Sequence, residues 1–222
     1  MKRLVILGST GPEIVKLLDA LKSRNRADFE VMGFLDDNPD RHAAQFMGYS
    51  VLGGSNLLQS QFTDALVINN VAKTTALRHK VWKRLEGMGA QFYTAIHPDV
   101  DVNYTTIGSG AIVQEGVVMG PEVLVGQHCI VCFGSIIAHE RSVGDCCFLS
   151  PGTIINGRVN VRKGAFVGAG AVLLPNVTIG EWSLVGAGSV VTEDVPPHCT
   201  VFGSPARVIA DRRPKAPEGS PA

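Results

Sequence analysis

The adjacent pair His139-Glu140 is the clearest candidate for catalytic chemistry in this chain of 222 residues. A neutral imidazole can take a proton from an attacking nucleophile, and a neighbouring carboxylate can orient or polarise that imidazole, as in many general bases. An exposed histidine beside a solvated glutamate would have the same sequence. The pair taken alone favours this surface interpretation.

The loop Gly8-Ser9-Thr10-Gly11 is a second candidate site, because it follows an apolar segment at the N-terminus. A dinucleotide fingerprint needs three glycines in the pattern G-x-G-x-x-G, and this loop has two. Pro12 also removes a backbone donor that a phosphate would use. Asp36 closes a second apolar segment, where a carboxylate can bond to ribose hydroxyls. These features favour a nucleotide or nucleotide-sugar over NAD, with a tight turn and a capping aspartate as the structural alternative.

A six-residue repeat over residues 107–191 must position the His-Glu pair. Every sixth residue is a large aliphatic side chain in fifteen consecutive hexads, and the residue four places later is small or aliphatic in all but one, where Arg141 stands. Such a period is typical of a parallel β-helix, in which three hexads make one triangular coil. We therefore predict about five coils with the aliphatic residues inside, so that Val131, Leu149 and Val167 stack.

The five cysteines allow a metal or redox interpretation, because Cys129 and Cys132 form a C-x-x-C pair. The chain has no second pair of this kind. Cys129 and Cys147 are separated by three hexads, which predicts that they stack as small inward residues on adjacent coils. Buried free cysteines that behave as small hydrophobic residues are the favoured interpretation.

Residues 1–98 follow another pattern, in which predicted strands alternate with predicted helices. Apolar segments indicate strands at residues 3–7, 31–35, 49–52, 65–68 and 92–96. Pro12 opens one helix and residues 75–86 form another, both with apolar side chains at helical spacing. The alternation predicts βαβ units with a parallel sheet. We predict an α/β domain over 1–98, an all-β parallel β-helix over 99–209 and a disordered tail over 210–222.

The composition excludes several classes of partner. Lysine plus arginine balances aspartate plus glutamate, giving a formal net charge of zero, so neither nucleic acid nor an anionic membrane is an expected partner. No apolar run approaches the length of a membrane span, and the N-terminal apolar segment is too short for a signal peptide. We expect a cytoplasmic location.

The chain resembles the left-handed β-helix (hexapeptide-repeat) acyltransferases. More narrowly, it is similar to the nucleotide-amino-sugar N-acetyltransferases and sialic-acid O-acetyltransferases that carry an N-terminal Rossmann-like domain. The resemblance covers residues 2–209 and rests on the fifteen hexads together with Gly8–Gly11, Leu35-Asp36-Asp37, Asn69-Asn70, Ile96-His97-Pro98, His139-Glu140 and Gly203-Ser204-Pro205-Ala206-Arg207. It implies a Rossmann-like N-terminal domain and a left-handed coil, although right-handed crossovers are the general rule.

The resemblance implies an acetyl-CoA-dependent N-acetyltransferase without a metal. The acceptor would be the amine of a nucleotide-linked sugar, expected to be a 4-amino-4,6-dideoxy sugar. His139 would be the general base, and Glu140 would raise its basicity. Gly157 lies three hexads after His139, so its backbone N–H would donate to the thioester carbonyl from the next coil.

The resemblance also implies a homotrimer, in which coenzyme A lies in the groove between two neighbouring β-helices. The backbone near Phe148, Ala169 and Ala187 would contact the coenzyme. Apolar residues such as Ile130, Ile136 and Phe148 are expected on the outer faces of the β-helix. The residues expected to bind the nucleotide-sugar are Gly8, Ser9, Thr10, Gly11, Asp36, Asp37 and Asn69.

Two positions depart from the family pattern. Pro12-Glu13 stands where the family usually has histidine or another polar residue after the glycine loop, so the identity of the nucleotide-sugar, and nucleotide binding itself, is open. Arg141 replaces a small residue at an inward corner. Because an uncompensated buried guanidinium is costly, we expect Arg141 to turn outward through local distortion or to pair with an acid.

Three other functions are compatible with the fold. The first is O-acetylation of a sialic acid or a related sugar. A zinc-dependent γ-type carbonic anhydrase is disfavoured, because it needs three histidine ligands and the hexads hold only His128 and His139. The third is a non-catalytic hexapeptide-repeat scaffold, against which His139-Glu140 and the Gly-Ser-Pro-Ala-Arg segment near the C-terminus argue.

Overall fold

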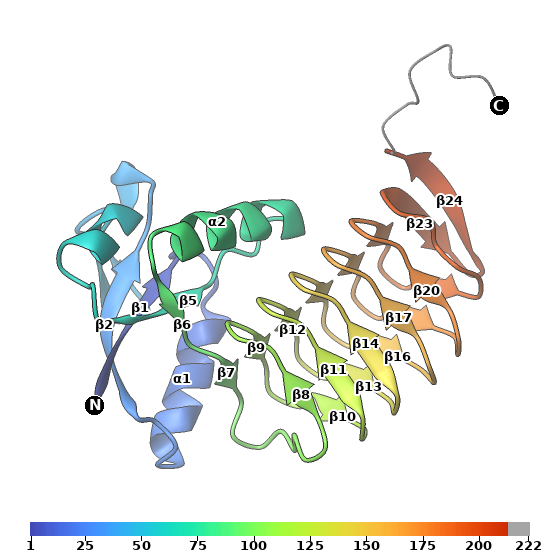
Figure 1. Ribbon diagram of the computed structural model, residues 1–222, viewed down its shortest axis with the longest axis horizontal. Helices are drawn as coiled ribbons and strands as arrows, with labels where there is room; N and C mark the ends of the chain where they lie inside the picture. Colours follow the sequence, from blue (N-terminus) through green and yellow to red (C-terminus); the bar gives the residue numbers. More distant parts are fainter. Residues whose placement is uncertain (213–222) are drawn as a thin grey trace, which may run out of the picture.

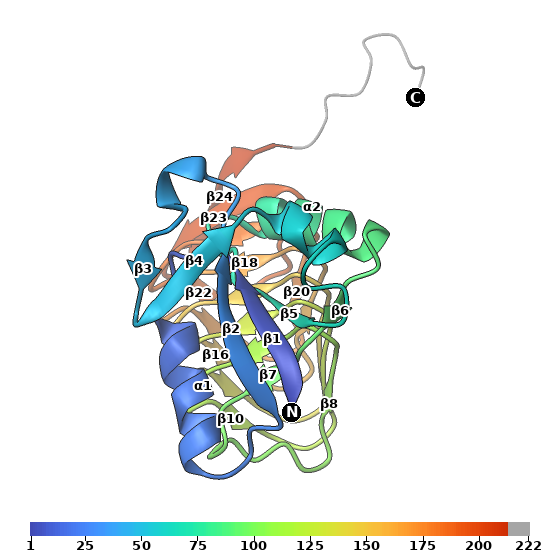
Figure 2. The same ribbon diagram turned by 90° about the vertical axis from the view of Figure 1, so that its left-hand side faces the viewer.

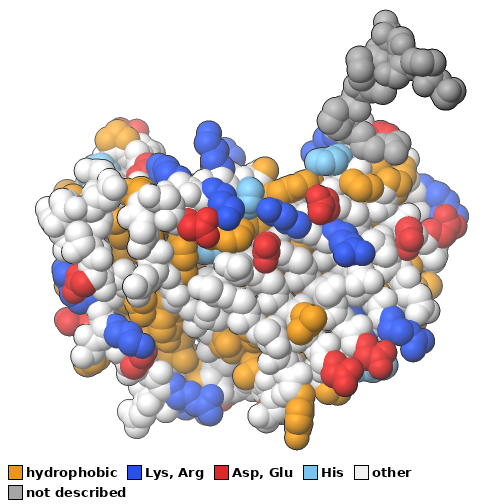
Figure 3. Space-filling model, in the orientation of Figure 1, with side chains coloured by type: hydrophobic (Ala, Val, Ile, Leu, Met, Phe, Trp, Pro, Cys, Tyr) orange, Lys and Arg blue, Asp and Glu red, His pale blue; other side chains and the backbone are white. Residues whose placement is uncertain are grey.

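A parallel β-helix joined at one end to an α/β domain makes up the chain in a computed structural model that describes residues 1–212 (Figure 1). Viewed along the long axis, the α/β sheet lies in front of the coils (Figure 2). Charged side chains of both signs are scattered over the face shown in Figure 3, as the zero net charge leads one to expect. Within residues 1–212, the helices are too short or too polar to cross a membrane.

The α/β domain is built on a six-stranded sheet in the order β3-β4-β2-β1-β5-β6. All pairs are parallel except β3 with β4. The elements are β1 (Lys2–Leu7), α1 (Glu13–Ser23), β2 (Phe29–Leu35), η1 (Pro39–Arg41), β3 (Gln45–Phe46), β4 (Tyr49–Gly53), η2 (Ser55–Gln59), β5 (Leu66–Asn69), α2 (Thr75–Gly87) and β6 (Gln91–Phe92). The domain is thus a mixed sheet with two α-helices.

The two faces of this sheet are covered by different helices. Successive side chains of a strand point to opposite faces, so Leu4 and Ile6 pack with α1 while Val5 and Leu7 pack with η2 and α2. The apolar stripe predicted for the first helix is buried, and its members are Ile14, Val15, Leu17, Leu18 and Leu21. The α1 layer is therefore held by the amphipathic pattern that the sequence shows.

The predicted strand over 92–96 is wrong in one respect, because the segment divides between two sheets. Its first part belongs to β6, which pairs with β5. Its last part is β7 (Ala95–Ile96), which pairs with β9 of the β-helix. The chain crosses from one sheet to the other at Tyr93 and Thr94. Pairing with the β-helix thus begins before residue 98.

The β-helix has three parallel faces. The β8 face contains β8 (Thr106–Ile107), β11 (Val123–Val125), β14 (Arg141–Val143), β17 (Asn160–Val161) and β20 (Thr178–Ile179). The β10 face contains β10 (Val118–Met119), β13 (Ile136–Ile137), β16 (Ile154–Ile155), β19 (Val172–Leu173) and β22 (Val190–Val191). The domain face, against which the α/β domain packs, contains β7, β9 (Ile112–Val113), β12 (Ile130–Val131), β15 (Phe148–Leu149), β18 (Phe166–Val167), β21 (Leu184–Val185), β23 (Cys199–Gly203) and β24 (Ala206–Asp211).

The hexad register predicted from the sequence is confirmed. Val131 pairs with Leu149, and Leu149 with Val167, so the three stack on one face. The aliphatic positions are buried except Ile107 and Met119, which lie half-buried in the first coil. The β8 and β10 faces each have five strands, which agrees with the predicted five coils.

Glycine at the turns permits the close stacking of the coils. A Cβ atom on Gly168 would lie 2.5 Å from the backbone nitrogen of Ala187 on the next coil. This separation is shorter than any ordinary non-bonded contact, so a side chain there would push the coils apart. The recurrence of glycine directly after the inward aliphatic residue therefore has a steric cause.

The cysteines lie in the interior. All five are free and buried, and Cys129 and Cys147 belong to the core of the β-helix, as predicted. Burial raises the pKa of Cys132 and of Cys146 to about 12, which makes both poor thiolates. Residues 1–212 contain no cluster of three or more His, Cys, Asp or Glu side chains that would hold a metal ion.

A buried arginine joins the two parts of the chain. Arg78 of α2 is 1% exposed and donates to the carbonyl oxygens of Asn69 and Val71 beside β5. It also donates to the carbonyl oxygens of Gly110, at 3.4 Å, and His128, at 2.6 Å, in the β-helix. The guanidinium therefore bonds to backbone on both sides of the junction.

The imidazole of His128 packs against aromatic side chains of the α/β domain at the same junction. Its ring centroid lies 4.5 Å from that of Trp82 and 4.4 Å from that of Phe92. Burial, followed by the charge of Arg78, lowers the pKa of His128 to about 3. The ring is therefore neutral and serves as packing, so it does not supply a ligand or a base.

The predicted tail falls only partly within the described residues. Ala210 and Asp211 belong to β24, and the backbone N–H of Arg212 donates to the carbonyl oxygen of His198 at 3.0 Å. The tail predicted over 210–222 therefore begins with ordered strand residues. Residues 213–222 lie outside the described part of the chain.

Candidate functional site

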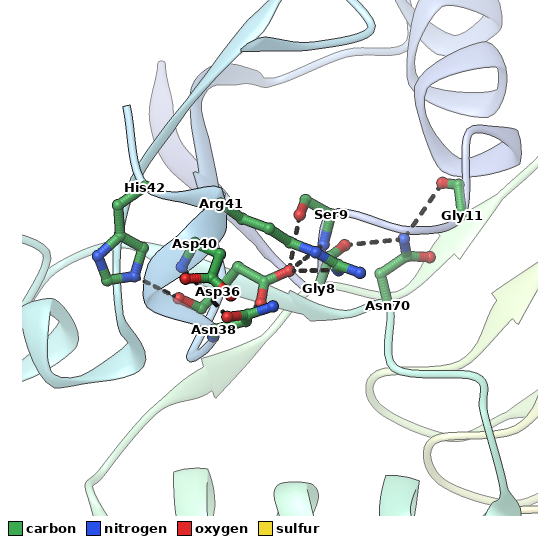
Figure 4. Close-up of polar contacts among 9 residues, drawn as sticks. All are labelled: Gly8, Ser9, Gly11, Asp36, Asn38, Asp40, Arg41, His42 and Asn70. Carbon is green, nitrogen blue, oxygen red and sulfur yellow. Dashed lines mark hydrogen bonds and ion pairs between the residues drawn. The ribbon is translucent and has the colours of Figure 1, made fainter. Parts of the chain in front are cut away.

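The glycine loop meets Asp36 at the ends of β1 and β2 (Figure 4). The carboxylate of Asp36 accepts a hydrogen bond from the backbone N–H of Ser9 at 3.0 Å and one from its hydroxyl at 2.6 Å. Gly8 has a φ of 96°, which favours glycine, and Thr10 is exposed. The structure thus brings the predicted loop and the predicted acid into one cluster.

Two further donors engage the Asp36 carboxylate. The backbone N–H of Asn38 and the guanidinium of Arg41 each donate to it at 3.0 Å. Burial raises the pKa of Asp36, but the hydrogen bonds from Ser9, Asn38 and Arg41 outweigh burial and bring the pKa to about 2. The carboxylate is ionised at neutral pH, and a ribose would have to share it with these donors.

Asp37 and Asn69 have partners elsewhere. The carboxylate of Asp37 accepts from the backbone N–H of Ser55 at 2.8 Å and from Arg84 at 2.6 Å, which ties the end of β2 to η2 and α2. Asn69 is fully buried and donates to the carbonyl oxygen of Arg78 at 3.2 Å. Both side chains therefore serve structural contacts in this state of the protein.

Asn70 is the asparagine that reaches the glycine loop. Its Nδ2 donates to the carbonyl oxygens of Gly8 and Gly11, each at 3.2 Å (Figure 4). The sequence contains the signal, since Asn69 and Asn70 both follow an apolar strand. Only the pleat decides which of the two points at the loop.

A cavity of about 210 Å³ lies where this loop faces the β-helix. Gly11, Glu13 and Asn70 line it from the α/β domain, and Phe133, Phe148 and Pro151 are among the residues that line it from the coils. Phe148 is half-buried there, with its ring stacked on Phe166 at a centroid distance of 5.2 Å. The glycine loop and one edge of the β-helix therefore face each other across this cavity.

That edge carries the residues expected to contact coenzyme A. The turns that follow the domain-face strands stack through backbone hydrogen bonds of 2.8 to 3.0 Å between successive coils. We call this row the alanine edge, and its residues are Phe133, Pro151, Ala169 and Ala187. Ala169 and Ala187 are exposed. An extended ligand along this edge would meet mostly backbone and small side chains.

His139 lies on a different edge. The turns after the β10-face strands form the histidine edge, which carries His139 and, one coil further on, Gly157. The Nδ1 of His139 is 4.0 Å from a carboxylate oxygen of Glu140, and both side chains are about half exposed. Arg158 also lies 4.0 Å from Glu140. The imidazole is thus accessible and has a carboxylate within ion-pair reach.

The structure does not bring all the predicted site residues together within one chain. Among residues 1–212, His139 has no hydrogen bond, ion pair or ring contact with the glycine loop or the alanine edge. The β10 face separates the histidine edge from the alanine edge. Within residues 1–212, the candidate residues therefore lie at two separate places, the histidine edge and the region of the glycine loop and the alanine edge.

Arg141 departs from expectation, because it neither turns outward nor pairs with an acid. It lies in β14 and is 2% exposed. One guanidinium nitrogen, Nη1, donates to the carbonyl oxygen of Glu140 at 3.2 Å. The side chain folds inside because its Cβ occupies an inward position of the repeat. The left-handed φ of 57° at Glu140 is the regular geometry of this corner, since Glu122 and Arg158 at the same hexad position have φ values of 60° and 56°.

A larger cavity of about 720 Å³ lies on the far side of the domain face, against α2. It contains none of the predicted site residues, and its lining includes Lys73, His79, Phe166, Trp182, His198 and Arg212. The candidate site residues therefore do not line this cavity.

Comparisons with known proteins agree with this geometry. Residues 158–193 match the bacterial transferase hexapeptide family (six repeats). The chain is 28% identical to perosamine N-acetyltransferase from Caulobacter crescentus, a histidine variant of which was solved in complex with CoA and GDP-perosamine. The two folds superpose with a TM-score of 0.84 over 95% of this chain and 98% of that one. No curated protein sequence matches the chain.

Two further solved structures have the same fold. WeeI from Acinetobacter baumannii is 25% identical, with a TM-score of 0.81 over 94% of this chain and 100% of that one. The acetyltransferase domain of PglB from Neisseria gonorrhoeae is 24% identical, with a TM-score of 0.85 over 94% and 100%. The fold of the chain is thus that of hexapeptide-repeat acetyltransferases. Its parallel coils and hexads are those of a left-handed β-helix.

The acetyltransferase domain of PglB from Neisseria gonorrhoeae was also solved in complex with acetyl coenzyme A. Resonance in the acetyl thioester is weak, so an amine or hydroxyl can attack its carbonyl carbon once a base removes the proton. The exposed imidazole on the histidine edge is suited to that task. The alanine edge offers the extended backbone surface that a long co-substrate needs.

Proposed function

We propose that the protein transfers an acetyl group from acetyl-CoA to the amine of a nucleotide-linked amino sugar, a 4-amino-4,6-dideoxy sugar. The observation that carries this proposal is the likeness over 95% of the chain to perosamine N-acetyltransferase, whose solved structures contain CoA and GDP-perosamine. The likeness extends over the α/β domain, which an acyltransferase that consists of a β-helix alone does not have. O-acetylation of a sialic acid or a related sugar is the alternative.

In this proposal the α/β domain is Rossmann-like and holds the nucleotide. Its parallel strands follow the order β4-β2-β1-β5-β6, with the glycine loop and Asp36 at the carboxyl ends of the two central strands β1 and β2. In open α/β sheets, ligands bind outside those ends. Arg41 adds a positive charge 3.0 Å from Asp36, which suits a diphosphate.

His139 is the proposed base and Glu140 its assistant. The amine attacks the acetyl carbon as His139 takes its proton, and the backbone N–H of Gly157 donates to the oxygen that becomes negative. At 4.0 Å, Glu140 is too far from the imidazole for a hydrogen bond. Its effect is therefore electrostatic in the free protein and smaller than that of the base itself.

We also propose a homotrimer, because the β10 face is apolar on its outer side. Five outward β-branched residues stack there in register, with Val118 57% and Ile136 41% exposed, and the set is Val118, Ile136, Ile154, Val172 and Val190. Of the residues expected on outer faces, Ile130 is instead covered by the α/β domain. A second copy against the β10 face would set its alanine edge beside this chain's histidine edge.

The trimer predicts a mass in solution of three times the chain mass of 23.6 kDa. Val172→Glu places a charge in the centre of the apolar β10 face, where burying it is costly, and should reduce the mass measured by light scattering. Thr178→Glu, on the outer side of the β8 face, is the matched control and should leave the mass unchanged. A wild-type monomer at micromolar concentration would contradict the trimer.

A substrate panel tests the proposed reaction. We expect acetyl transfer to an amino sugar linked to GDP, UDP or dTDP. The reaction can be monitored through the release of free CoA thiol, and the product can be identified by mass spectrometry. The matching hydroxy sugar and sialic acid serve as the comparison. Transfer to sialic acid alone would establish the O-acetyltransferase alternative. Binding without turnover of any acceptor would favour a scaffold.

A further inference from the structure

Arg141 occupies a position that the rest of the repeat reserves for small or aliphatic side chains. Its neighbours in the stack are Val123 on the preceding coil and Val159 at the equivalent hexad position on the next. Both are buried, and Arg141 itself is 2% exposed. A guanidinium is thus enclosed in an aliphatic column, next to the corner that carries His139.

The charge of Arg141 is poorly compensated there. Its Nη1 donates to the carbonyl oxygen of Glu140, but Nε and Nη2 are buried and have no hydrogen-bond partner among residues 1–212. Arg78, the other buried arginine, contrasts with it, because Nε, Nη1 and Nη2 of Arg78 all bond to backbone carbonyls. Burial lowers the pKa of Arg141, yet arginine keeps its proton in proteins.

Arg141 lies close to residues that take part in the proposed reaction. Its nearest acid is Glu140, whose negative charge acts on it. On the next coil, a Cβ atom placed on Gly157 would lie 3.7 Å from Nη2. The guanidinium therefore lies between the corner of His139 and Glu140 and the backbone of Gly157.

We propose that Arg141 is a positioning residue for acetyl transfer, which fixes the His139-Glu140 corner through the Glu140 carbonyl and places a positive charge beside Gly157. This inference rests on the proposed function. As the amine nitrogen bonds to the acetyl carbon, the carbonyl π electrons move to oxygen and His139 takes the amine proton. When the carbonyl re-forms, the carbon–sulfur bond breaks and the CoA thiolate takes that proton.

The negative charge on oxygen exists only between those two steps. A fixed positive charge in a low-dielectric interior stabilises it without contact and needs no reorganisation. The same charge in the resting protein has no benefit, because an unpaired buried cation destabilises the fold. Replacing a residue that costs stability and favours the intermediate should lower kcat without lowering the melting temperature.

The test replaces Arg141 with methionine, which has similar length and no charge. We expect kcat to fall about 10- to 100-fold, less than the loss of a donor in direct contact, with KM for acetyl-CoA nearly unchanged. The melting temperature should stay the same or rise. Arg141→Lys keeps the charge and should recover part of kcat. Arg162→Met, which removes an exposed arginine of the β-helix, is the matched control and should behave as wild type.

Two results would overturn the proposal. A wild-type kcat in Arg141→Met would show that the charge has no part in the reaction. A lower melting temperature in that variant, with no recovery in Arg141→Lys, would make Arg141 an ordinary structural residue, whatever the activity. Failure of the proposed function is seen separately, as a wild-type protein that acetylates no amino sugar or a His139→Asn variant that keeps full turnover.

Discussion

Replacing His139 with asparagine should lower turnover about 10²- to 10⁴-fold, which is the usual contribution of a general base. The imidazole is half exposed on the histidine edge and has Glu140 as its nearest acid. Asparagine keeps a polar side chain of similar size but cannot take the proton from an attacking amine. KM for acetyl-CoA should change little, because the alanine edge, not His139, is the proposed binding surface.

A similar protein shows that ligand binding can survive the loss of a histidine. Variants of perosamine N-acetyltransferase with one histidine replaced by asparagine or alanine were solved in complex with CoA and GDP-perosamine. Loss of a histidine there leaves both ligands in place. For this chain, kcat and KM should be measured from about pH 6 to 9, a range that brackets ordinary imidazole titration.

His198→Asn is the matched control for this experiment. His198 also sits in a turn of the β-helix, with a left-handed φ of 58° that asparagine tolerates. It belongs to neither the histidine edge nor the alanine edge, so turnover should be retained. Glu140→Gln should cost less than His139→Asn, because Glu140 only assists. Near-wild-type turnover of His139→Asn over the whole pH range would return His139 to the class of exposed surface residues.

The β-helix was readable from the sequence because one physical constraint repeats in it fifteen times. Each coil must fill its interior with side chains at fixed spacing, so the pattern predicted the stacking of Val131, Leu149 and Val167. Helix α1 was readable for the same reason, since its buried residues follow the helical period. Side chains that are buried at regular intervals produce a regular hydrophobic pattern in the sequence.

Single contacts between distant segments produce no such pattern in the sequence. Arg78 sits in a helix whose apolar residues gave no sign that a charged neighbour is buried. The choice between Asn69 and Asn70 depends on one pleat, and the partners of Asp37 come from two other elements. The sequence located the strand ends, whereas the direction of each side chain required the packed structure.

The candidate site was only half readable for a further reason. Hexad counting placed His139 and Gly157 on successive coils, but the edge on which they lie differs from the edge of Ala169 and Ala187. A period within one chain carries no information about a second chain. The arrangement of the two edges gives the proposed trimer its role, because neither edge alone has both a base and a co-substrate surface.

Replacing Arg78 with methionine should destabilise the protein by about 1 to 3 kcal/mol for each buried carbonyl oxygen that is left without a donor. Carbonyl oxygens from both parts of the chain would lose their donor, and those of Asn69 and His128 are the most closely held. Buried carbonyls left without a donor pay a desolvation penalty. The loss should appear as a lower midpoint in denaturant and a lower melting temperature.

Arg84→Met is the matched control on the same helix. Arg84 is 46% exposed and bonds to Asp37 at 2.6 Å, and an exposed pair of this kind contributes about 1 kcal/mol or less. Arg78→Lys should fall between the two, because lysine keeps the charge but lacks the planar fork that reaches several carbonyls at once. An Arg78→Met variant as stable as wild type would mean that the junction is held by the packing of His128 with Trp82 and Phe92 instead.

The comparison of Arg78→Met with Arg141→Met isolates the effect of hydrogen bonding on a buried guanidinium. Both arginines are enclosed and neither pairs directly with an acid among residues 1–212. Only Arg78 has carbonyl partners for all three of its guanidinium nitrogens. The same substitution should therefore lower the stability at residue 78 and leave it unchanged or raise it at residue 141. Equal losses at both positions would show that burial alone, and not the number of satisfied donors, sets the energetic role of these two arginines.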